Sequence, residues 1–192
     1  MNCIPNKTPN EMKGNEMIRM TLILAVCLSL ATPLVGLADD FKPDTSKTYY
    51  IDCLAAEARL SGDGRTVSQW GYTVKTLKGV ETSETGDDVK WQFVAVGDKW
   101  HIQLASGGDD SRLWATKLTD ANGLALTNTD KSGGWTQFTI TDAGDGKYFV
   151  TAPEGPEGFR RMKFLMDDKI GVVKASNSDV FCQVTITEVE DN

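Results

Sequence analysis

The sequence has little of what metal and acid–base chemistry need, since it contains one histidine, His101, and four cysteines in 192 residues. No Cys-x-x-Cys pair is present, and zinc sites are built from such pairs or from several histidines. A general base needs a second group to orient it, and no serine or cysteine motif accompanies His101. We therefore predict a protein that is not an enzyme and that carries no metal or other cofactor.

Positive charge is scarce as well. Lysine and arginine number 20 against 27 aspartates and glutamates, which leaves a net charge of −7. Nucleic-acid binding needs a basic face toward the phosphates, and anionic membrane surfaces attract basic segments. The charge balance therefore excludes nucleic acid and anionic membrane surfaces as expected partners.

The sequence has only one long apolar run, residues 21–37, which follows a short basic start and ends at the small residues Gly36 and Ala38. A basic start, an apolar centre and small residues at the cleavage site are typical of a secretory signal peptide. This pattern predicts cleavage before Asp39.

A membrane anchor is the alternative, but a span needs roughly 20 apolar residues, and this run holds 17 and includes Pro33. A lipoprotein cleavage box at Cys27 is a second alternative, to which Val26 is poorly suited. We predict that 1–38 is an N-terminal extension with a signal peptide. Residues 39–192 then form a single domain, secreted or periplasmic, with no stable membrane insertion after cleavage.

The cysteines that remain after residue 38 are Cys53, near the start of the domain, and Cys182, near its end. Two cysteines in an exported chain favour one disulfide bond. The alternative is a pair of separate buried thiols.

Four sequence features recur three times in the same order. They are an aromatic residue two before Ile or Val (Tyr49, Trp100, Tyr148), an Arg before an apolar residue (Arg59, Arg112, Arg161), a short strand-like piece (74–76, 126–128, 173–175) and a Gln before an apolar residue (Gln92, Gln137, Gln183). A fixed period is the signature of a repeat architecture. We place the repeats at about 41–96, 97–144 and 145–192.

Each repeat contains about four short runs of alternating apolar and polar residues, separated by turns rich in Gly, Asp and Asn. No convincing helical periodicity is present after residue 38. Three units of four strands predict an all-β fold, the β-trefoil, in which six strands close a barrel and three hairpins cap it. Closure removes exposed sheet edges. A β-sandwich is the alternative, but it does not explain a threefold period.

Barrel closure brings the first and last strands together, and both cysteines have inward-facing parity on them. Cys53 shares the parity of Ile51, and Cys182 shares that of Val184. A disulfide between them would close a loop of about 130 residues and stabilise the domain by about 4 to 5 kcal/mol.

Two pairs of segments, 91–93 with 100–102 and 135–138 with 148–150, are similar to the repeats of a known family. They resemble the ricin B-type lectin and fascin-like group of the β-trefoil superfamily, and the resemblance covers almost the whole domain. It implies a non-catalytic binding module with a glycan as ligand, and we expect the domain to be a monomer. Alternatives on the same fold are a soybean-type Kunitz protease inhibitor and a module that binds an extracellular protein.

The resemblance also implies where a sugar would bind. In that family a carboxylate near the end of a repeat's first strand accepts bonds from sugar hydroxyls, and an exposed aromatic ring stacks on the sugar. Only the first repeat offers this combination, with Asp52 followed by Trp70 and Tyr72, whereas Gln103 and Thr151 stand at the matching positions. The alternative for Asp52 is a solvated aspartate on a strand. The Gln-x-Trp motif of the sugar-binding members lacks its glutamine in all three repeats.

The tryptophans divide into two groups. Trp114 has outward parity relative to Leu113, which makes it a candidate ligand platform, with a core position as the alternative. Trp91, Trp100 and Trp135 are predicted to lie in the core.

Four further expectations concern polar residues. His101 should be exposed, because it alternates with apolar neighbours on a barrel strand. The three repeat arginines form either a basic collar for an anion or pairs with local carboxylates. Segment 154–160 is the longest irregular loop, where Arg160 or Arg161 could serve a protease inhibitor. The Gly-Asp turns at 61–64 and 142–146 are interpreted as hairpin turns, because neither has the ligand pattern of a calcium loop.

Overall fold

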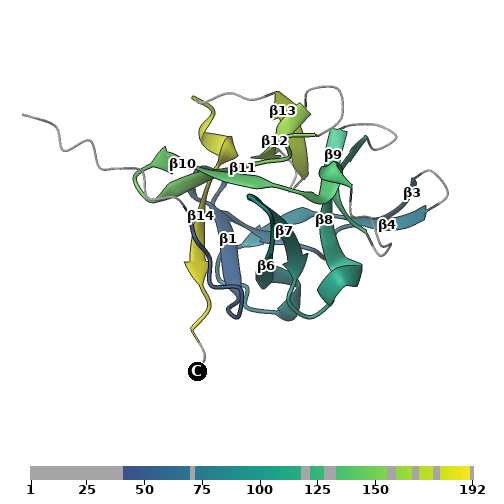
Figure 1. The fold of residues 1–192 in the computed structure, drawn as a ribbon, viewed down its shortest axis with the longest axis horizontal. Helices are drawn as coiled ribbons and strands as arrows, with labels where there is room; N and C mark the ends of the chain where they lie inside the picture. The colour runs from purple at the N-terminus through teal and green to yellow at the C-terminus, as the bar shows by residue number, and fades with distance from the viewer. Residues whose placement is uncertain are drawn as a thin grey trace, which may run out of the picture. The chain divides into compact units, whose positions relative to one another are not determined.

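The computed structural model describes residues 41–69, 72–117, 122–127, 133–154, 159–165, 169–174 and 178–190. Within these residues the chain forms β-strands linked by turns and by single-turn 3-10 helices, labelled η (Figure 1). Among the same residues no helix is long and apolar enough to cross a membrane.

The strands fall into three lobes. Lobe 1 contains β1 (Tyr49–Cys53), η1 (Leu54–Ala56), β2 (Ala58–Ser61), β3 (Thr66–Gln69), β4 (Tyr72–Thr76), β5 (Lys78–Glu81), η2 (Asp87–Val89) and β6 (Trp91–Val96). Lobe 2 contains β7 (Lys99–Leu104), η3 (Gly108–Ser111), β8 (Arg112–Lys117), β9 (Asn122–Thr127), η4 (Gly134–Thr136) and β10 (Thr139–Gly144). Lobe 3 contains β11 (Lys147–Thr151), β12 (Phe159–Phe164), β13 (Ile170–Lys174), η6 (Val180–Cys182) and β14 (Gln183–Glu188).

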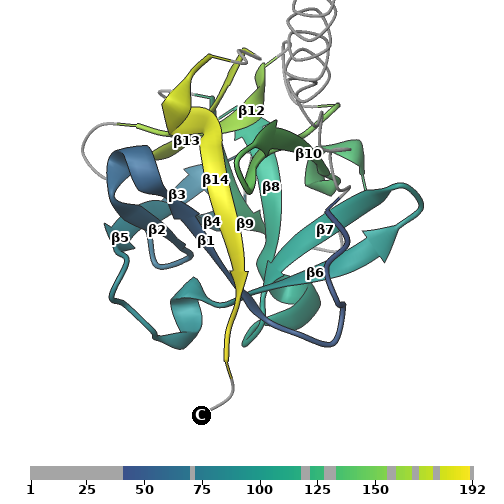
Figure 2. The ribbon, with the colours of Figure 1, turned by 90° about the vertical axis from the view of Figure 1, so that its left-hand side faces the viewer.

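Strands from all three lobes pair in a closed circuit. β1 pairs with β6, β6 with β7, β10 with β11, β11 with β14, and β14 with β1. The step from β7 to β10 is made by Trp100 and Phe138, whose backbone amides each donate to the other's carbonyl at 2.8 Å. Figure 2 shows β14 lying alongside β1, where the circuit closes. Because the circuit returns to its start, these strands present no long open edge.

The remaining strands form hairpins that follow the first strand of each lobe. In every lobe the repeat arginine stands opposite one residue of that first strand. These pairs are Asp52 with Arg59, Gln103 with Arg112, and Thr151 with Arg161. The sequence match of Asp52 with Gln103 and Thr151 is therefore confirmed by the strand register.

Lobe 1 departs from the threefold pattern because it carries an extra hairpin made of β3 and β4, here called the inserted hairpin (Figure 1). The strand that pairs with β2 is β5, just as β9 pairs with β8 and β13 with β12. Segment 74–76 belongs to β4, which pairs with β9 of the next lobe. The sequence match of 74–76 with the ends of β9 and β13 is therefore wrong, because the strand of lobe 1 that corresponds to β9 and β13 is β5.

Inward-facing side chains of the circuit form the main core. Ile51, Ile102 and Val150, one from each lobe, are 0% exposed, as the alternation of strand residues predicts. Trp91 is also 0% exposed, and its indole Nε1 donates to the Leu60 carbonyl at 3.0 Å. The predicted core position of Trp91 is confirmed, and its one polar group has the partner that burial requires.

Aromatic rings meet within this core. The ring of Phe93 lies 5.2 Å from that of Phe41, 5.3 Å from Tyr49 and 6.4 Å from Trp100, all edge-on. Phe93 is 0% exposed, while Trp100 is partly buried and packs against the core rather than inside it. Edge-on geometry is the favoured arrangement of aromatic pairs, so Phe93 is a centre of the packing.

A second, smaller cluster, here called the satellite core, joins the inserted hairpin to lobe 2. It contains Val74, Trp114 and Ala125, with the partly buried Val67 and Trp135 packed against them. Trp114 lies outside the main core, as its parity predicts, but it is only 3% exposed because the inserted hairpin contributes Val74 against it. The structure therefore corrects two expectations: Trp114 offers no exposed ring, and Trp135 packs in the satellite core instead of the main one.

His101 is 5% exposed, so the expectation that it faces solvent is wrong. The reason is that η4 covers this part of β7. Thr136 of η4 is itself 1% exposed, and its Oγ1 lies 3.5 Å from His101 Nε2. Alternation along a strand predicts which face a residue takes, but not whether a later turn covers that face.

One ion pair within lobe 3 links β12 to the start of η6, and it should make folding acid-sensitive. Lys163 Nζ donates to Asp179 Oδ2 at 2.6 Å, and this bond holds the pKa of Asp179 below its usual value. A depressed folded-state pKa adds stability above the unfolded value near 3.9, and that stability is lost as pH falls through the folded pKa.

We expect the thermal midpoint of Asp179→Asn to fall less than that of the parent between about pH 5 and pH 3, because the substituted side chain cannot titrate. The control is Asp98→Asn, at an exposed position, which should follow the parent profile. Superimposable profiles for all three proteins would contradict the prediction.

Candidate functional site

Asp52, the carboxylate predicted from sequence to bind sugar, is occupied within the protein. Arg59 donates to both of its oxygens, from Nε to Oδ1 at 2.8 Å and from Nη2 to Oδ2 at 2.9 Å. The Arg59 and Asp52 side chains are 9% and 14% exposed, and Arg59 Nη1 also donates to the Glu84 carbonyl at 2.6 Å. A two-pronged pair of this kind is strong and directional, so the geometry gives Asp52 a structural role.

Two of the three repeat arginines, Arg59 and Arg161, stack on aromatic rings of their own lobes. The guanidinium carbon of Arg59 lies 3.6 Å from the centre of the Tyr50 ring, and that of Arg161 lies 3.9 Å from the centre of Phe149. Both arginines are 8% exposed. In lobe 1 the arginine pairs with a local carboxylate, which is the second of the two interpretations of the repeat arginines. Neither side chain extends into solvent as part of a collar.

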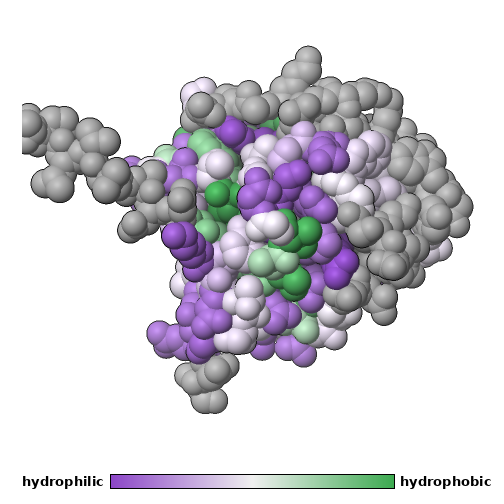
Figure 3. Space-filling model, viewed as in Figure 1, coloured by the Kyte–Doolittle hydropathy of each residue, from purple (hydrophilic) through white to green (hydrophobic). Residues whose placement is uncertain are grey.

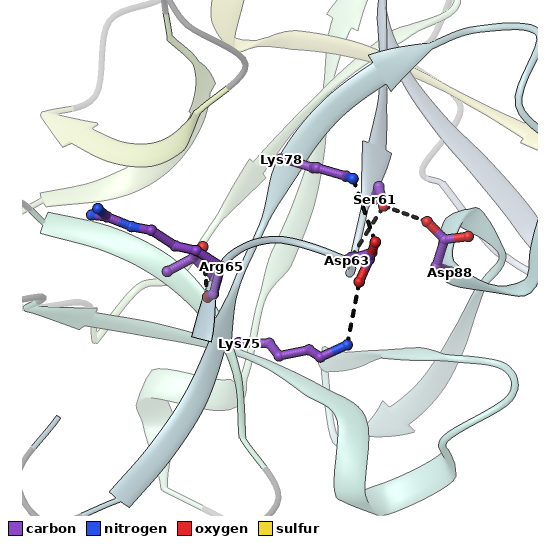
Figure 4. A network of polar contacts seen from close by, with 7 residues as sticks. Ser61, Asp63, Arg65, Lys75, Lys78 and Asp88 are labelled. Atoms are coloured by element: carbon purple, nitrogen blue, oxygen red, sulfur yellow. Dashed lines mark hydrogen bonds and ion pairs between the residues drawn. The ribbon is translucent and has the colours of Figure 1, made fainter. Parts of the chain in front are cut away.

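An exposed polar cluster lies at the base of the inserted hairpin, where the chain passes from β2 to β3 (Figure 4). We call it the hairpin-foot cluster; its members are Ser61, Asp63, Lys75, Lys78 and Asp88. Lys75 Nζ lies 3.3 Å from Asp63 Oδ1, and Lys78 Nζ lies 3.5 Å from Asp63 Oδ2. Ser61 Oγ donates to Asp88 Oδ2 at 2.6 Å and accepts from the Asp63 amide at 3.1 Å.

The cluster combines a buried anchor with an exposed carboxylate. Ser61 is 0% exposed, whereas the Asp63 side chain is 58% exposed. The hydrogen bond from Lys75 and the charge of Lys78 hold the pKa of Asp63 below its usual value. Asp63 therefore stays ionised at neutral pH and presents a fixed hydrogen-bond acceptor to solvent.

Backbone packing fixes the loop that carries Asp63. The Gly62 amide donates to the Asp88 carbonyl at 2.8 Å, and the Thr76 amide donates to the Arg65 carbonyl at 2.9 Å. A side chain at Gly64 would meet the carbonyl of Thr76, so this close approach requires glycine. The Ser-Gly-Asp-Gly segment is thus a rigid support rather than a free turn.

The other candidates from sequence lie as follows. Tyr72 begins β4, on the same strand as Lys75, whereas Trp70 lies outside the described residues. Asp52 is on β1, which pairs with β2, β6 and β14, while β4 pairs with β3 and β9. The structure therefore does not bring Asp52 and Tyr72 onto neighbouring strands. Asp63, whose side chain is 58% exposed, lies at the foot of the hairpin that contains Tyr72.

The end of segment 154–160, the candidate loop for protease inhibition, belongs to a strand. Arg160 and Arg161 lie within β12, and the guanidinium of Arg161 is held over Phe149. Residues 155–158 are outside the described residues. An inhibitor presents its primary side chain on an exposed loop, and Arg161 does not do so.

Neither Gly-Asp turn has the surroundings of a metal site. Residues 142–146 connect β10 to β11, with left-handed backbone at Gly144, Asp145 and Gly146, which is the geometry of a hairpin turn. Within the described part of the chain, no group of three or more His, Cys, Asp or Glu side chains could hold a metal ion.

Sequence reasoning missed the hairpin-foot cluster because Ser-Gly-Asp-Gly64 carries the same local signal as any tight turn. The available signal was length: the first repeat, at about 41–96, is longer than the other two. An insertion marks the place where one repeat differs from the other two, and loops on a rigid scaffold commonly carry function.

No protein-family model matches the sequence, and no curated protein matches it. Solved structures do match. The designed threefold-symmetric protein ThreeFoil has a TM-score of 0.59 at 15% identity, covering 74% of this chain and 99% of that one. The BEL β-trefoil has a TM-score of 0.59 at 9% identity, covering 80% and 100%. The ricin B-like lectin of Macrolepiota procera, solved with lactose, has a TM-score of 0.55 at 15% identity, covering 77% and 99%. The chain is therefore a β-trefoil, as the threefold period of the sequence predicts.

Proposed function

We propose that this protein is an exported, non-catalytic binding module that holds a carbohydrate at the hairpin-foot cluster. The observation that carries the proposal is the Asp63 carboxylate, exposed to solvent and fixed by Lys75 and Lys78. Each carboxylate oxygen has one lysine donor, so each retains a further lone pair that can accept a bond from a hydroxyl. Neighbouring hydroxyls of one sugar ring suit such a paired acceptor.

Two further features support a sugar ligand. Tyr72 begins β4, and in the sequence Trp70 stands between β3 and β4. Aromatic rings stack on the apolar faces of sugars. The fold is shared with a lectin solved in complex with lactose. His101 is buried against Thr136 and is not exposed for acid–base chemistry, which supports binding rather than catalysis.

The binding proposal is tested by screening the protein on a glycan array and titrating the best glycan by calorimetry. Asp63→Asn should weaken binding by about 10-fold or more, because hydrogen bonds to a charged group contribute about 1.5–3 kcal/mol. Trp70→Ala should weaken glycan binding as well, because it removes an aromatic ring that can stack on the sugar. The matched control is Asp87→Asn, which removes a carboxylate paired with Lys90 at 3.3 Å elsewhere in lobe 1. No glycan bound by the parent, or equal affinity for Asp63→Asn, would contradict the proposal.

The export part rests on the leader at 17–38, with its basic start, apolar centre and small-residue end. Expression of the full chain in a secreting host should give a product whose first residue is Asp39, as read by N-terminal sequencing. Retention of the leader in the membrane fraction would favour an anchor instead.

A further inference from the structure

The two cysteines of the domain lie where its first strand meets its last. Cys53 ends β1, and Cys182 ends η6 directly before β14. β1 and β14 are antiparallel, and their paired register ends with Asp52 opposite Thr185. One further step along this ladder sets Cys53 opposite Val184, which is two residues after Cys182 in the chain.

Atomic contacts bring the two residues together. Cys53 Sγ lies 3.9 Å from the carbonyl oxygen of Val180 and 3.8 Å from that of Phe181. The Phe181 carbonyl is bonded to the amide nitrogen of Cys182, so the Cys53 sulfur lies against the backbone that carries Cys182. Both cysteines are 0% exposed, and both are free thiols in this structure.

The turns that flank the cysteines have little apolar packing of their own. Leu54 of η1 is 59% exposed, and Val180 and Phe181 of η6 are 49% and 41% exposed. Segments with few buried apolar contacts open at low free-energy cost. The turns η1 and η6 therefore stabilise the contact between β1 and β14 only weakly. A covalent link at this place would add the stability that apolar packing does not provide.

We propose that Cys53 and Cys182 form a disulfide bond in the exported protein, which ties the first strand of the domain to the last. A thiolate of one cysteine attacks a small-molecule disulfide, such as oxidised glutathione, and displaces one thiolate. The second cysteine thiolate then attacks the protein sulfur of this mixed disulfide and releases the other thiol. Two electrons pass to the oxidant, and the two protons lost by the cysteines end on its two thiols.

The disulfide bond would form during folding, before β14 has paired with β1. Burial raises the pKa of the Cys53 thiol, and it raises the pKa of Cys182 to about 11. Because the thiolate is the reacting form, the folded and reduced domain is protected from oxidation both by burial and by protonation. Oxidation during folding in an oxidising compartment, which the proposed export provides, avoids both obstacles.

Peptide mapping tests the proposal on the full chain. The protein is exported to an oxidising compartment, purified without reductant, alkylated under denaturing conditions and digested with trypsin. Cleavage after lysine and arginine places Cys53 in peptide 48–59 and Cys182 in peptide 175–192. The expected product is these two peptides linked, lighter than their sum by two hydrogens. Recovery of both peptides as separate alkylated species from the exported protein would overturn the proposal.

A thermal melt gives an independent measurement. Reductant should lower the midpoint of the exported protein by about 10 °C or more, because the bond closes a loop of well over 100 residues. The double variant Cys53→Ala/Cys182→Ala should melt at the same temperature with and without reductant. An equal midpoint for the parent in both conditions would also count against the bond, and this comparison requires no variant to fold.

Discussion

Phe93→Ala is expected to lower the free energy of unfolding by about 4 kcal/mol, the usual cost of removing a buried phenylalanine. Phe93 is 0% exposed, and its ring packs edge-on against Phe41, Tyr49 and Trp100. The rings come from three separate parts of the chain and cannot all move into the space that the substitution leaves. Since domains are stable by only about 5–15 kcal/mol, this one change removes a large share of the total.

The measurement is chemical denaturation followed by tryptophan fluorescence. The matched control is Phe181→Ala, a loss of the same ring at a position that is 41% exposed. That variant should stay within about 1 kcal/mol of the parent. If the two variants lose equal stability, Phe93 does not have the central role in packing that its contacts indicate.

Asp52→Ala is the second change with a large expected effect, a loss of about 3 kcal/mol. The reason is that Arg59 would keep its charge at 9% side-chain exposure without the carboxylate that now accepts two of its hydrogen bonds. Breaking one half of a buried ion pair costs more than replacing both halves by apolar side chains. The double variant Asp52→Leu/Arg59→Met should therefore stay closer to the parent than Asp52→Ala does.

The control for this prediction is Asp87→Ala, which breaks an ion pair to Lys90 in which the aspartate side chain is 78% exposed. Exposed pairs contribute at most about 1 kcal/mol, so this variant should melt close to the parent. Equal losses for Asp52→Ala and Asp87→Ala would show that the Arg59 pair is not structural. The experiment also separates the two interpretations of Asp52. If Asp52 served to bind sugar, Asp52→Ala would lower the affinity for the glycan without lowering the stability of the protein.

The threefold plan of the fold could be predicted from sequence because every lobe repeats its own local signals. Aromatic-x-Ile/Val starts such as Tyr148 to Val150 mark a strand with one buried face, and that property depends only on alternation along the strand. The match of Asp52 with Gln103 and Thr151 followed from the same period, and the register confirms it.

What could not be predicted depends on contacts between distant segments. Segment 74–76 has the pattern of any short strand, and only the pairing of β2 with β5 shows that β4 belongs to an inserted hairpin. The alternation along their strands predicts that Trp114 and His101 are exposed, but β4 and η4, which come from other parts of the chain, cover them. Asp63 could not be identified from sequence, because a Gly-Asp-Gly turn does not show whether lysine side chains from later strands will pair with it.

The described surface carries both hydrophilic and hydrophobic residues. In the view of Figure 3 the described surface is largely hydrophilic, and hydrophobic residues gather only in small patches.

The pairing of β1 with β14 also has a consequence for the order of folding. Thr185 Oγ1 reaches the carbonyl of Asp52 across 133 residues of chain, so the contact that closes the circuit is among the most distant in sequence. Contacts of such long range slow folding, because the loop between them must lose its freedom before the contact forms. A chain that is still emerging from a ribosome or a translocation pore lacks β14. Until β14 arrives, β1 and β11 lack the strand with which each of them pairs. The domain therefore completes its barrel only after nearly the whole chain has been delivered, and until then two strand edges stay open to the wrong partner.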